Sequence, residues 1–404
     1  MIKTRKKSFL FLFFVTVILI IILFNIVLHF NLPSPNYEYR QLALPDNFSL
    51  PDARVIAMGT ATHGNAEPYD ITIEMLQRIK ESRGHVSFVL EEETGDSVII
   101  NRNHSYYDNE REMLIGTYGV YNNREMDRLL SWIKSENVNL YGIDVKSIYQ
   151  IVEVIKGFLN EKGYSDINID KLHLNTYLEY EIQINRNHEV IEQIKKIMNE
   201  LLKSKSIDER EFDYISHLLH CIQMNCEYIL GGKQNNVRDS MMAENVLWVM
   251  EHELKYYNNE YILLLAHNGH IIKDNYNFEN IDEQFIPMGY YLSAALGDDY
   301  YSIVTEAKNN SFLAINNLRT DKRKLFSIEC IGSLIDAIGV ESPRIKLCTS
   351  ENLIQAGIST WGLTVIGSYF DKIRTFKPTH FTINTNVETC FDAMLYFDQL
   401  TPNN

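Results

Sequence analysis

One stretch of the sequence decides the fold: Arg54-Val-Ile-Ala-Met-Gly-Thr-Ala-Thr-His-Gly-Asn-Ala-Glu67. Its first part, residues 55–58, is a short apolar run with β-branched residues at its start, which is typical of a buried central strand in an α/β sheet. Gly59 lets the backbone turn sharply at the carboxyl end of that strand. We therefore expect His63 and Glu67 in the crevice outside this end, where open α/β sheets bind their ligands.

Other apolar runs along the chain also stop at polar residues. Residues 86–90 lead into Glu91-Glu-Glu93, residues 138–144 end at Asp144, and residues 261–266 lead into His267-Asn-Gly-His270. Helical patterns at 67–81 and 122–134 alternate with these runs, and residues 300–305 and 393–398 have the pattern of further strands. This alternation predicts an α/β fold, a mostly parallel sheet with helices on both faces.

Strand patterns stop between about residues 147 and 256. Long helical patterns replace them, at 148–159, 172–202, 209–230 and 237–254. We therefore expect an inserted helical lobe at 147–256, inside a domain that spans residues 48–404.

Composition fits a globular protein with a sizeable core. The chain has 404 residues, of which 45% are hydrophobic and 23% charged, enough for one large domain or two medium ones. The formal net charge is −15, and no basic patch is visible. Nucleic acid is therefore not expected as a partner, because phosphate binding needs such a patch.

The amino-terminal segment has the features of a membrane anchor. Residues 8–24 contain no charge, and with residues 25–30 the run is long enough to span a bilayer as a helix of about 20 residues. Four basic residues within 1–7 predict a cytoplasmic tail and place the rest of the chain outside. The alternative is a cleaved signal peptide, but the run is long and no small-x-small cleavage site follows. We expect a single-pass anchor at 8–30, a proline-containing linker at 31–47, and a cell-membrane protein whose folded domain faces outward.

The strand ends carry groups suited to two kinds of chemistry. In the first, His63 is a general base that activates water against a carbonyl carbon, while a carboxylate orients the imidazole and a second histidine or an arginine steadies the oxyanion. In the second, His63, Glu91, His267 and His270 bind a metal such as Zn²⁺. His267-x-x-His270 follows a strand, so it is not the zincin motif, and no Gly-x-Ser-x-Gly motif occurs. The residue types leave both chemistries open.

Several stretches, in order along about residues 50–402, resemble the erythromycin esterase family. They are residues 59–67, 88–91, 140–144, 238–245, 266–270, 288–289 with 296–297, and 391–397. The resemblance implies an α/β core with a helical lobe, and hydrolysis of macrolide lactone rings without a cofactor or metal, the chemistry of antibiotic resistance enzymes.

The resemblance also implies roles for particular residues. His63 would be the base that activates water, Glu91, His267 and His270 would line the same cleft, and Arg238 would help to shape it. Glu67 and Asp144, which follow the strand ends, are expected to support this site.

Two positions depart from the usual pattern of that family. Its motif usually has a glutamate at the position of Thr60, and it tends to have a basic residue at the position of Thr72. A hydroxyl cannot stabilise an imidazolium by charge. The leading hypothesis is a membrane-anchored hydrolase of a small-molecule ester or lactone, and the alternative is a catalytically impaired relative that binds a ligand at the cell envelope.

Overall fold

The computed structural model describes residues 43–45, 48–103, 121, 123–172, 180–277, 284–316, 323–329, 345–371 and 380–403. The six strands expected from the sequence are all present, and four more lie in the carboxyl-terminal part. The strands are β1 (Val55–Thr60), β2 (Ser87–Glu93), β3 (Leu140–Asp144), β4 (Ile262–His267), β5 (Tyr300–Ile315), β6 (Arg323–Glu329), β7 (Ile345–Thr349), β8 (Thr360–Thr364), β9 (Thr382–Asn386) and β10 (Ala393–Leu400).

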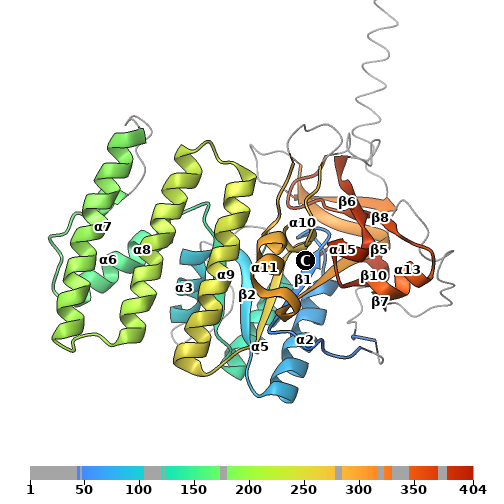
Figure 1. The fold of residues 1–404 in the computed structure, drawn as a ribbon, viewed down its shortest axis with the longest axis horizontal. Coiled ribbons are helices and arrows are strands. Elements are labelled where there is room, and N and C mark those ends of the chain that lie inside the picture. Colours follow the sequence, from blue (N-terminus) through green and yellow to red (C-terminus); the bar gives the residue numbers. More distant parts are fainter. Residues whose placement is uncertain are drawn as a thin grey trace, which may run out of the picture.

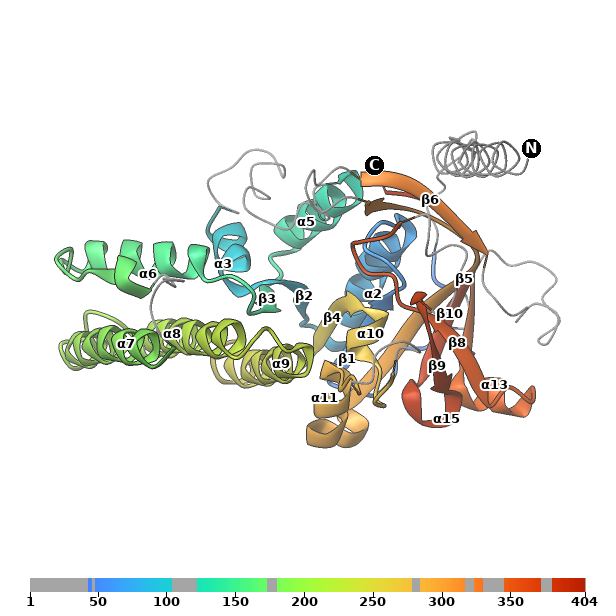
Figure 2. The same cartoon turned by 90° about the horizontal axis from the view of Figure 1, so that it is seen from above.

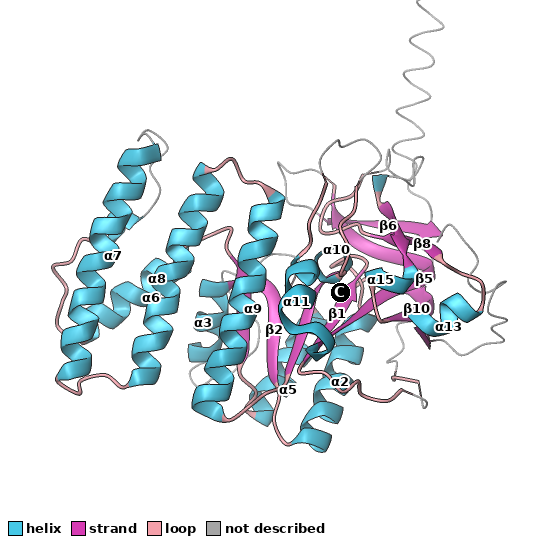
Figure 3. Cartoon of the chain, in the orientation of Figure 1, coloured by secondary structure: helices cyan, strands magenta, loops and turns pink. Residues whose placement is uncertain are grey.

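Within the described residues, eight of these strands form one mostly parallel sheet (Figure 3). Its order is β3-β2-β4-β1-β5-β10-β7, and β6 pairs with the far half of β5. The pairs from β3 to β10 are parallel, while β7 and β6 pair antiparallel with β10 and β5. Strands β8 and β9 form a separate antiparallel hairpin. The predicted mixed α/β fold with a mostly parallel sheet is therefore confirmed.

Helices cover both faces of the parallel part of the sheet. The helices among the described residues are α2 (Glu67–Arg83), α3 (Thr94–Asn103), α5 (Arg124–Glu136), α6 (Tyr149–Glu161), α7 (Tyr180–Lys203), α8 (Glu209–Leu230), α9 (Asn235–Tyr257), α10 (Asn268–Ile271), α11 (Met288–Leu296), α13 (Ser350–Gln355) and α15 (Val387–Cys390), with short 3-10 turns η1 (Ile169–Leu172) and η2 (Gly297–Asp299). Figure 2 shows α2 and α5 on one face of β2, β3 and β4, and α9 and α11 on the other. Each face has its own apolar core.

Four helices, α6 to α9, lie between β3 and β4 in the chain and extend to one side of the sheet (Figure 1). Helices α6, α7 and α8 pack with α3 around a third apolar core that includes Val152, Ile191 and Leu218. Helix α9 instead returns to the sheet, where Met242 and Val246 join the core of that face. The helical region therefore holds itself together while its last helix carries residues back toward the strand ends.

Two glycines of the opening stretch are needed for close packing. Gly59 lies inside β1, and a Cβ atom there would come within 2.3 Å of Oδ1 of Asn268. A Cβ atom on Gly64 would come within 1.9 Å of the carbonyl oxygen of Leu313. The sequence-based interpretation of Gly59 as a turn residue was wrong: β1 continues through it to Thr60, and the missing side chain makes room for α10.

Helix α2 begins directly after the His63 loop. Pro68 stands at its first turn, where a missing N–H costs nothing, and Glu67 and Asp70 place negative charge at the positive end of the helix dipole. Gly84, with φ +84°, ends the helix in a backbone conformation that suits glycine. The amino-terminal end of α2 therefore faces the carboxyl edge of the sheet, and its other end lies about 24 Å away, from the rise of about 1.5 Å per residue.

The predicted tail at 1–7 and anchor at 8–30 lie outside the described residues, as does all of the linker at 31–47 except residues 43–45. Across the part of the chain that the structure describes, no helix has both the length and the apolar character needed to cross a membrane.

Candidate active site at the carboxyl edge of the sheet

The carboxyl ends of four neighbouring parallel strands meet at one edge of the sheet. Thr60 ends β1 and is level with His267 at the end of β4, and Glu93 of β2 is level with Asp144 at the end of β3. Parallel strands put all their carboxyl ends on the same edge, which is why residues so distant in sequence become neighbours. The structure thus brings His63, Glu91, Asp144, His267 and His270 together.

Glu91 is at the centre of this cluster. Its Oε1 accepts a hydrogen bond from Nη2 of Arg238 at 3.1 Å and lies 3.3 Å from Nε2 of His270. Its Oε2 accepts the backbone N–H of His267 at 2.8 Å and lies 4.0 Å from Nε2 of His63. Burial alone would raise the pKa of Glu91, but His270, His63 and Arg238 together hold it well below its ordinary value. Glu91 is therefore ionised at neutral pH.

Arg238 connects Glu91 to Asp144. It lies in the first turn of α9, and its guanidinium donates to both carboxylate oxygens of Asp144, from Nε at 2.9 Å and from Nη2 at 2.7 Å. Burial would raise the pKa of Asp144, but Arg238 lowers it to about 2. This bidentate pair is the strong form of an arginine–carboxylate contact, and it fixes the guanidinium beside Glu91.

His270 lies in the one-turn helix α10, held by carboxylates on both sides. Its Nδ1 is 2.8 Å from Oδ1 and 2.9 Å from Oδ2 of Asp239, while Nε2 faces Glu91. Burial would lower the pKa of His270, but Asp239 and Glu91 raise it to about 9. The predicted strand before this motif is β4, which His267 ends, and the chain turns into α10 directly after it, so His270 lies on a helix.

His63 differs from His270 in its surroundings. Its ring lies 5.8 Å, centre to centre, from that of Tyr121 and 5.7 Å from that of His267, and its side chain is 11% exposed. Burial lowers the pKa of His63 below its ordinary value of 6.5, although Glu91 acts in the opposite direction. The imidazole is therefore neutral at pH 7, and it has the chemistry of a general base.

His267 is also neutral. Its Nε2 accepts the backbone N–H of Gly367 at 2.9 Å, and the carbonyl oxygen of Ala61 lies 3.2 Å from the same nitrogen. One neutral nitrogen cannot both accept and donate, and the shorter contact favours acceptance from Gly367, which leaves the ring proton on Nδ1. Burial lowers the pKa of His267 to about 3.

Three residues singled out in the sequence, Glu67, Thr72 and Thr60, make no side-chain hydrogen bond to the Glu91 cluster in the part of the chain that the structure describes. Glu67 accepts hydrogen bonds from the backbone N–H and the hydroxyl of Thr401, so its carboxylate connects α2 to the end of β10, and burial raises its pKa to about 7. The hydroxyl of Thr72 donates to the carbonyl of Pro68 within α2. The hydroxyl of Thr60 is buried and has no hydrogen-bond partner among the described residues.

We expect Thr60→Val to leave the free energy of unfolding unchanged or to raise it by about 1 kcal/mol, because a buried hydroxyl without a partner costs free energy that a methyl group does not. The matched control is Thr364→Val, which removes a hydroxyl that donates to Oε1 of Glu306 at 3.0 Å and should lower stability by about 1–3 kcal/mol. Urea unfolding of both variants measures these free energies. An equal loss of stability in the two variants would show that the Thr60 hydroxyl makes a stabilising hydrogen bond.

Three contributors to the site were missed from the sequence. Asp239 binds His270, Tyr121 approaches His63 and donates to the backbone oxygen of Glu91 at 2.9 Å, and Gly367 gives a backbone N–H to His267. Only Asp239 had a visible signal, since it directly follows Arg238. A backbone N–H and an isolated tyrosine leave no pattern in a single sequence.

Metal binding was the second chemistry left open. Among the described residues, no three histidine, cysteine, aspartate or glutamate side chains are placed to share one metal ion. Both ring nitrogens of His270 face protein groups, and Nε2 of His267 already accepts an N–H. The side chains as arranged do not fit a metal site.

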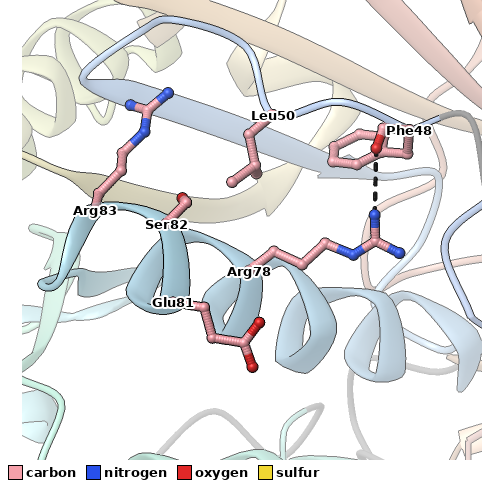
Figure 4. Close-up of a pocket in the computed structure, with 6 residues that line it drawn as sticks. All are labelled: Phe48, Leu50, Arg78, Glu81, Ser82 and Arg83. Atoms are coloured by element: carbon pink, nitrogen blue, oxygen red, sulfur yellow. Dashed lines mark hydrogen bonds between the residues drawn. The ribbon is translucent and has the colours of Figure 1, made fainter.

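A separate hollow of about 580 Å³ lies at the far end of α2 (Figure 4). Phe48, Leu50, Arg78, Glu81, Ser82 and Arg83 line it. Arg78 donates a hydrogen bond to the carbonyl of Phe48, and Arg83 donates to the carbonyls of Pro51 and Ala53. Both guanidinium groups therefore hold the segment before β1 against α2. This hollow contains none of the residues at the carboxyl edge of the sheet.

Comparisons with known proteins identify the family of this chain. A family model described as erythromycin esterase matches residues 81–400. Erythromycin esterase type II from Escherichia coli is 23% identical over 312 residues, which cover 68% of this chain and 73% of that protein.

Two solved structures share the fold at low sequence identity. A succinoglycan biosynthesis protein is 16% identical with a TM-score of 0.65, over 87% of this chain and 89% of its own. A mutant of erythromycin esterase EreC in its open conformation is also 16% identical, with a TM-score of 0.56, over 86% of this chain and 91% of its own. Because the family model covers most of its length, the chain belongs to the erythromycin esterase family.

Proposed function

We propose that this protein is a hydrolase of carboxylic esters, with a macrolide lactone as the substrate class and His63 as the general base. One observation carries the proposal: a neutral imidazole, partly open to solvent, stands 4.0 Å from a carboxylate that Arg238 and His270 keep ionised. Family membership supports the reaction type, since the curated relative is an erythromycin esterase.

The proposed reaction proceeds by direct attack of water. His63 takes a proton from water as the oxygen bonds to the carbonyl carbon, which gives a tetrahedral oxyanion and an imidazolium. Glu91 stabilises that imidazolium by charge. The intermediate then breaks its bond to the alkoxide, which receives the proton from His63, so the products are one carboxylic acid and one alcohol.

His267 is the proposed donor to the oxyanion. Its ring centre is 5.7 Å from that of His63, and acceptance of the Gly367 N–H leaves its proton on Nδ1. A neutral donor suits this role, because it can stabilise a developing negative charge without repelling the imidazolium that forms at His63.

Incubation of the full chain with a macrolide and with simple esters tests the proposal. Mass spectrometry should show a product that has gained one water. A protein that binds a macrolide saturably and yields no product from any ester would be a ligand-binding relative instead.

The pH dependence gives an independent check. The free base is the active form, and the pKa of His63 is lowered from 6.5, so on the acid side kcat/KM should stay constant through pH 7 and begin to fall only below pH 6.5. The measurement is the pH profile of kcat/KM on a stable simple ester. An acid limb with its midpoint above pH 6.5 would assign the base to a different group.

The same proposal places the folded domain outside the cell, anchored by residues 8–30. Its support is the uncharged run preceded by basic residues. Protease treatment of intact cells should remove the domain, and full protection in intact cells with cleavage only after lysis would reverse the orientation.

A further inference from the structure

Asp239 is a buried carboxylate that connects three helices. It lies near the amino-terminal end of α9, directly after Arg238, and is fully buried. Its Oδ1 and Oδ2 lie 2.8 and 2.9 Å from Nδ1 of His270 in α10, and Oδ2 also accepts the N–H of Met288 at the start of α11 at 3.1 Å. Burial raises the pKa of Asp239 above its ordinary value, whereas His270 and Arg238 act in the opposite direction, so its ionised form depends on a positive partner. The neighbouring guanidinium is hydrogen-bonded to Asp144 and Glu91, which leaves His270 as the hydrogen-bonded cation of Asp239.

The neighbours of the two ring nitrogens of His270 favour different protonation states. Nδ1 must carry a proton, because the carboxylate of Asp239 can only accept. Nε2 lies 3.3 Å from Oε1 of Glu91, which favours a second proton, and 3.2 Å from Nη1 of Arg238, which favours a lone pair. Two carboxylates outweigh one guanidinium, and the raised pKa of His270, about 9, agrees with a doubly protonated ring.

The charged and titratable groups around His270 come from several elements. Asp239 and Arg238 lie on α9, Glu91 on β2, His267 on β4 and His63 in the loop after β1. Of these, Asp239 contacts Nδ1 of His270, whereas Glu91, the carboxylate next to His63, contacts Nε2. Asp239 can therefore hold the proton on His270 from the other nitrogen of the ring.

We infer that Asp239 is a positioning residue of this site: it keeps His270 as an imidazolium, which in turn keeps Glu91 ionised in front of His63. The effect of Asp239 on catalysis rests on the proposed hydrolysis. Its effect on the protonation of His270 is independent of that proposal. Without the charge of Asp239, His270 becomes a neutral buried histidine. Glu91 then keeps the backbone N–H of His267 and one charged hydrogen-bond donor, Arg238, which it shares with Asp144.

The first test needs no substrate. In the full chain labelled at histidine, NMR titration should show His270 doubly protonated through pH 8, with the signal assigned by its loss in His270→Gln. In Asp239→Asn, which keeps the shape and removes the charge, the midpoint should fall by more than about one pH unit. Asp213→Asn is the matched control, because Asp213 pairs with Lys255 on the helical region, and it should leave the His270 midpoint unchanged.

The second test links the charge to turnover. Asp239→Asn should lower kcat on an ester about 10- to 100-fold with little change in KM, because Asp239 stabilises the transition state through other residues. Because activity needs a protonated His270, kcat of the wild type should fall as pH rises through about 9. In Asp239→Asn this decline should occur at lower pH. In a His270→Gln background, Asp239→Asn should have no further effect on kcat.

Several outcomes would overturn the inference. The first is that His270 of the wild type titrates below pH 7. The second is that the His270 midpoint is unchanged in Asp239→Asn. The third is that Asp239→Asn lowers kcat as much in the His270→Gln background as it does in wild type. The first uses only wild type and the assignment variant His270→Gln, so it applies even if Asp239→Asn does not fold. If wild type hydrolyses no ester, the proposed function fails, while the NMR midpoints still decide whether Asp239 controls His270.

Discussion

Replacement of His63 by glutamine is expected to lower kcat/KM for ester hydrolysis about 1,000-fold, within the range by which general bases contribute. Glutamine has a similar size and polarity but cannot take a proton from water. The fold should persist, because glutamine is of similar size and the main-chain oxygen of residue 63, not the ring, accepts the hydrogen bond from Asn403. Steady-state kinetics on a simple ester and on a macrolide measure the effect.

His220→Gln is the matched control for this substitution. His220 lies on α8, is 45% exposed and pairs with Glu244 at 2.7 Å, so the same change there should leave kcat/KM within about twofold of wild type, as for a surface pair. Equal turnover by His63→Gln and wild type would show that His63 is not the base.

Replacement of Arg238 by alanine is expected to destabilise the fold by about 3–5 kcal/mol, the cost of leaving buried charges uncompensated. Asp144 would keep Lys146 at 3.4 Å, and Glu91 would keep His270, but both would lose their hydrogen-bonded guanidinium. Because the pKa of Asp144 is lowered to about 2 from 3.8, the pair stabilises the fold above pH 3.8, and this contribution is lost as pH falls toward 2. Urea unfolding at pH 7 and at lower pH measures both effects.

Two further variants separate this effect from simple loss of an arginine. Arg210→Ala removes a half-exposed guanidinium 3.9 Å from Asp208 and should cost less than about 1 kcal/mol. Adding Asp144→Asn to Arg238→Ala should restore part of the lost stability, because it removes one of the uncompensated charges. A cost for Arg238→Ala as small as that for Arg210→Ala would mean that the buried cluster is not held by charge.

The sheet was predictable because its parallel strands are buried on both faces and so leave continuous apolar runs. Residues 55–58 and 393–398 each lie inside an observed strand, and residues 261–266 match β4 with a shift of one residue. The convergence of His63, Glu91, Asp144 and His267 followed from the same topology, since parallel strands share one carboxyl edge. The antiparallel β6 and β7 and the hairpin β8–β9 had weaker patterns, and individual bounds there were not predicted.

The partners within the site could not be predicted, because they depend on three-dimensional packing. Glu67 looked like a cleft residue by its spacing from His63, but its carboxylate is bound by Thr401, more than 300 positions away in the chain. Arg238 was placed near the cleft through family resemblance, whereas its bidentate contact with Asp144 appears only in the structure. Asp239 directly follows Arg238 in the sequence, but its contact with His270 is visible only in the structure.

The most direct test of the proposed hydrolysis is the fate of a macrolide in water enriched in heavy oxygen, with wild type and His63→Gln compared under identical conditions. We expect wild type to yield the ring-opened product with one heavy oxygen in its new carboxylic acid, and His63→Gln to yield almost none. Ring-opened product that forms equally fast with both proteins would contradict the role of His63, and intact macrolide with both would contradict the hydrolysis itself.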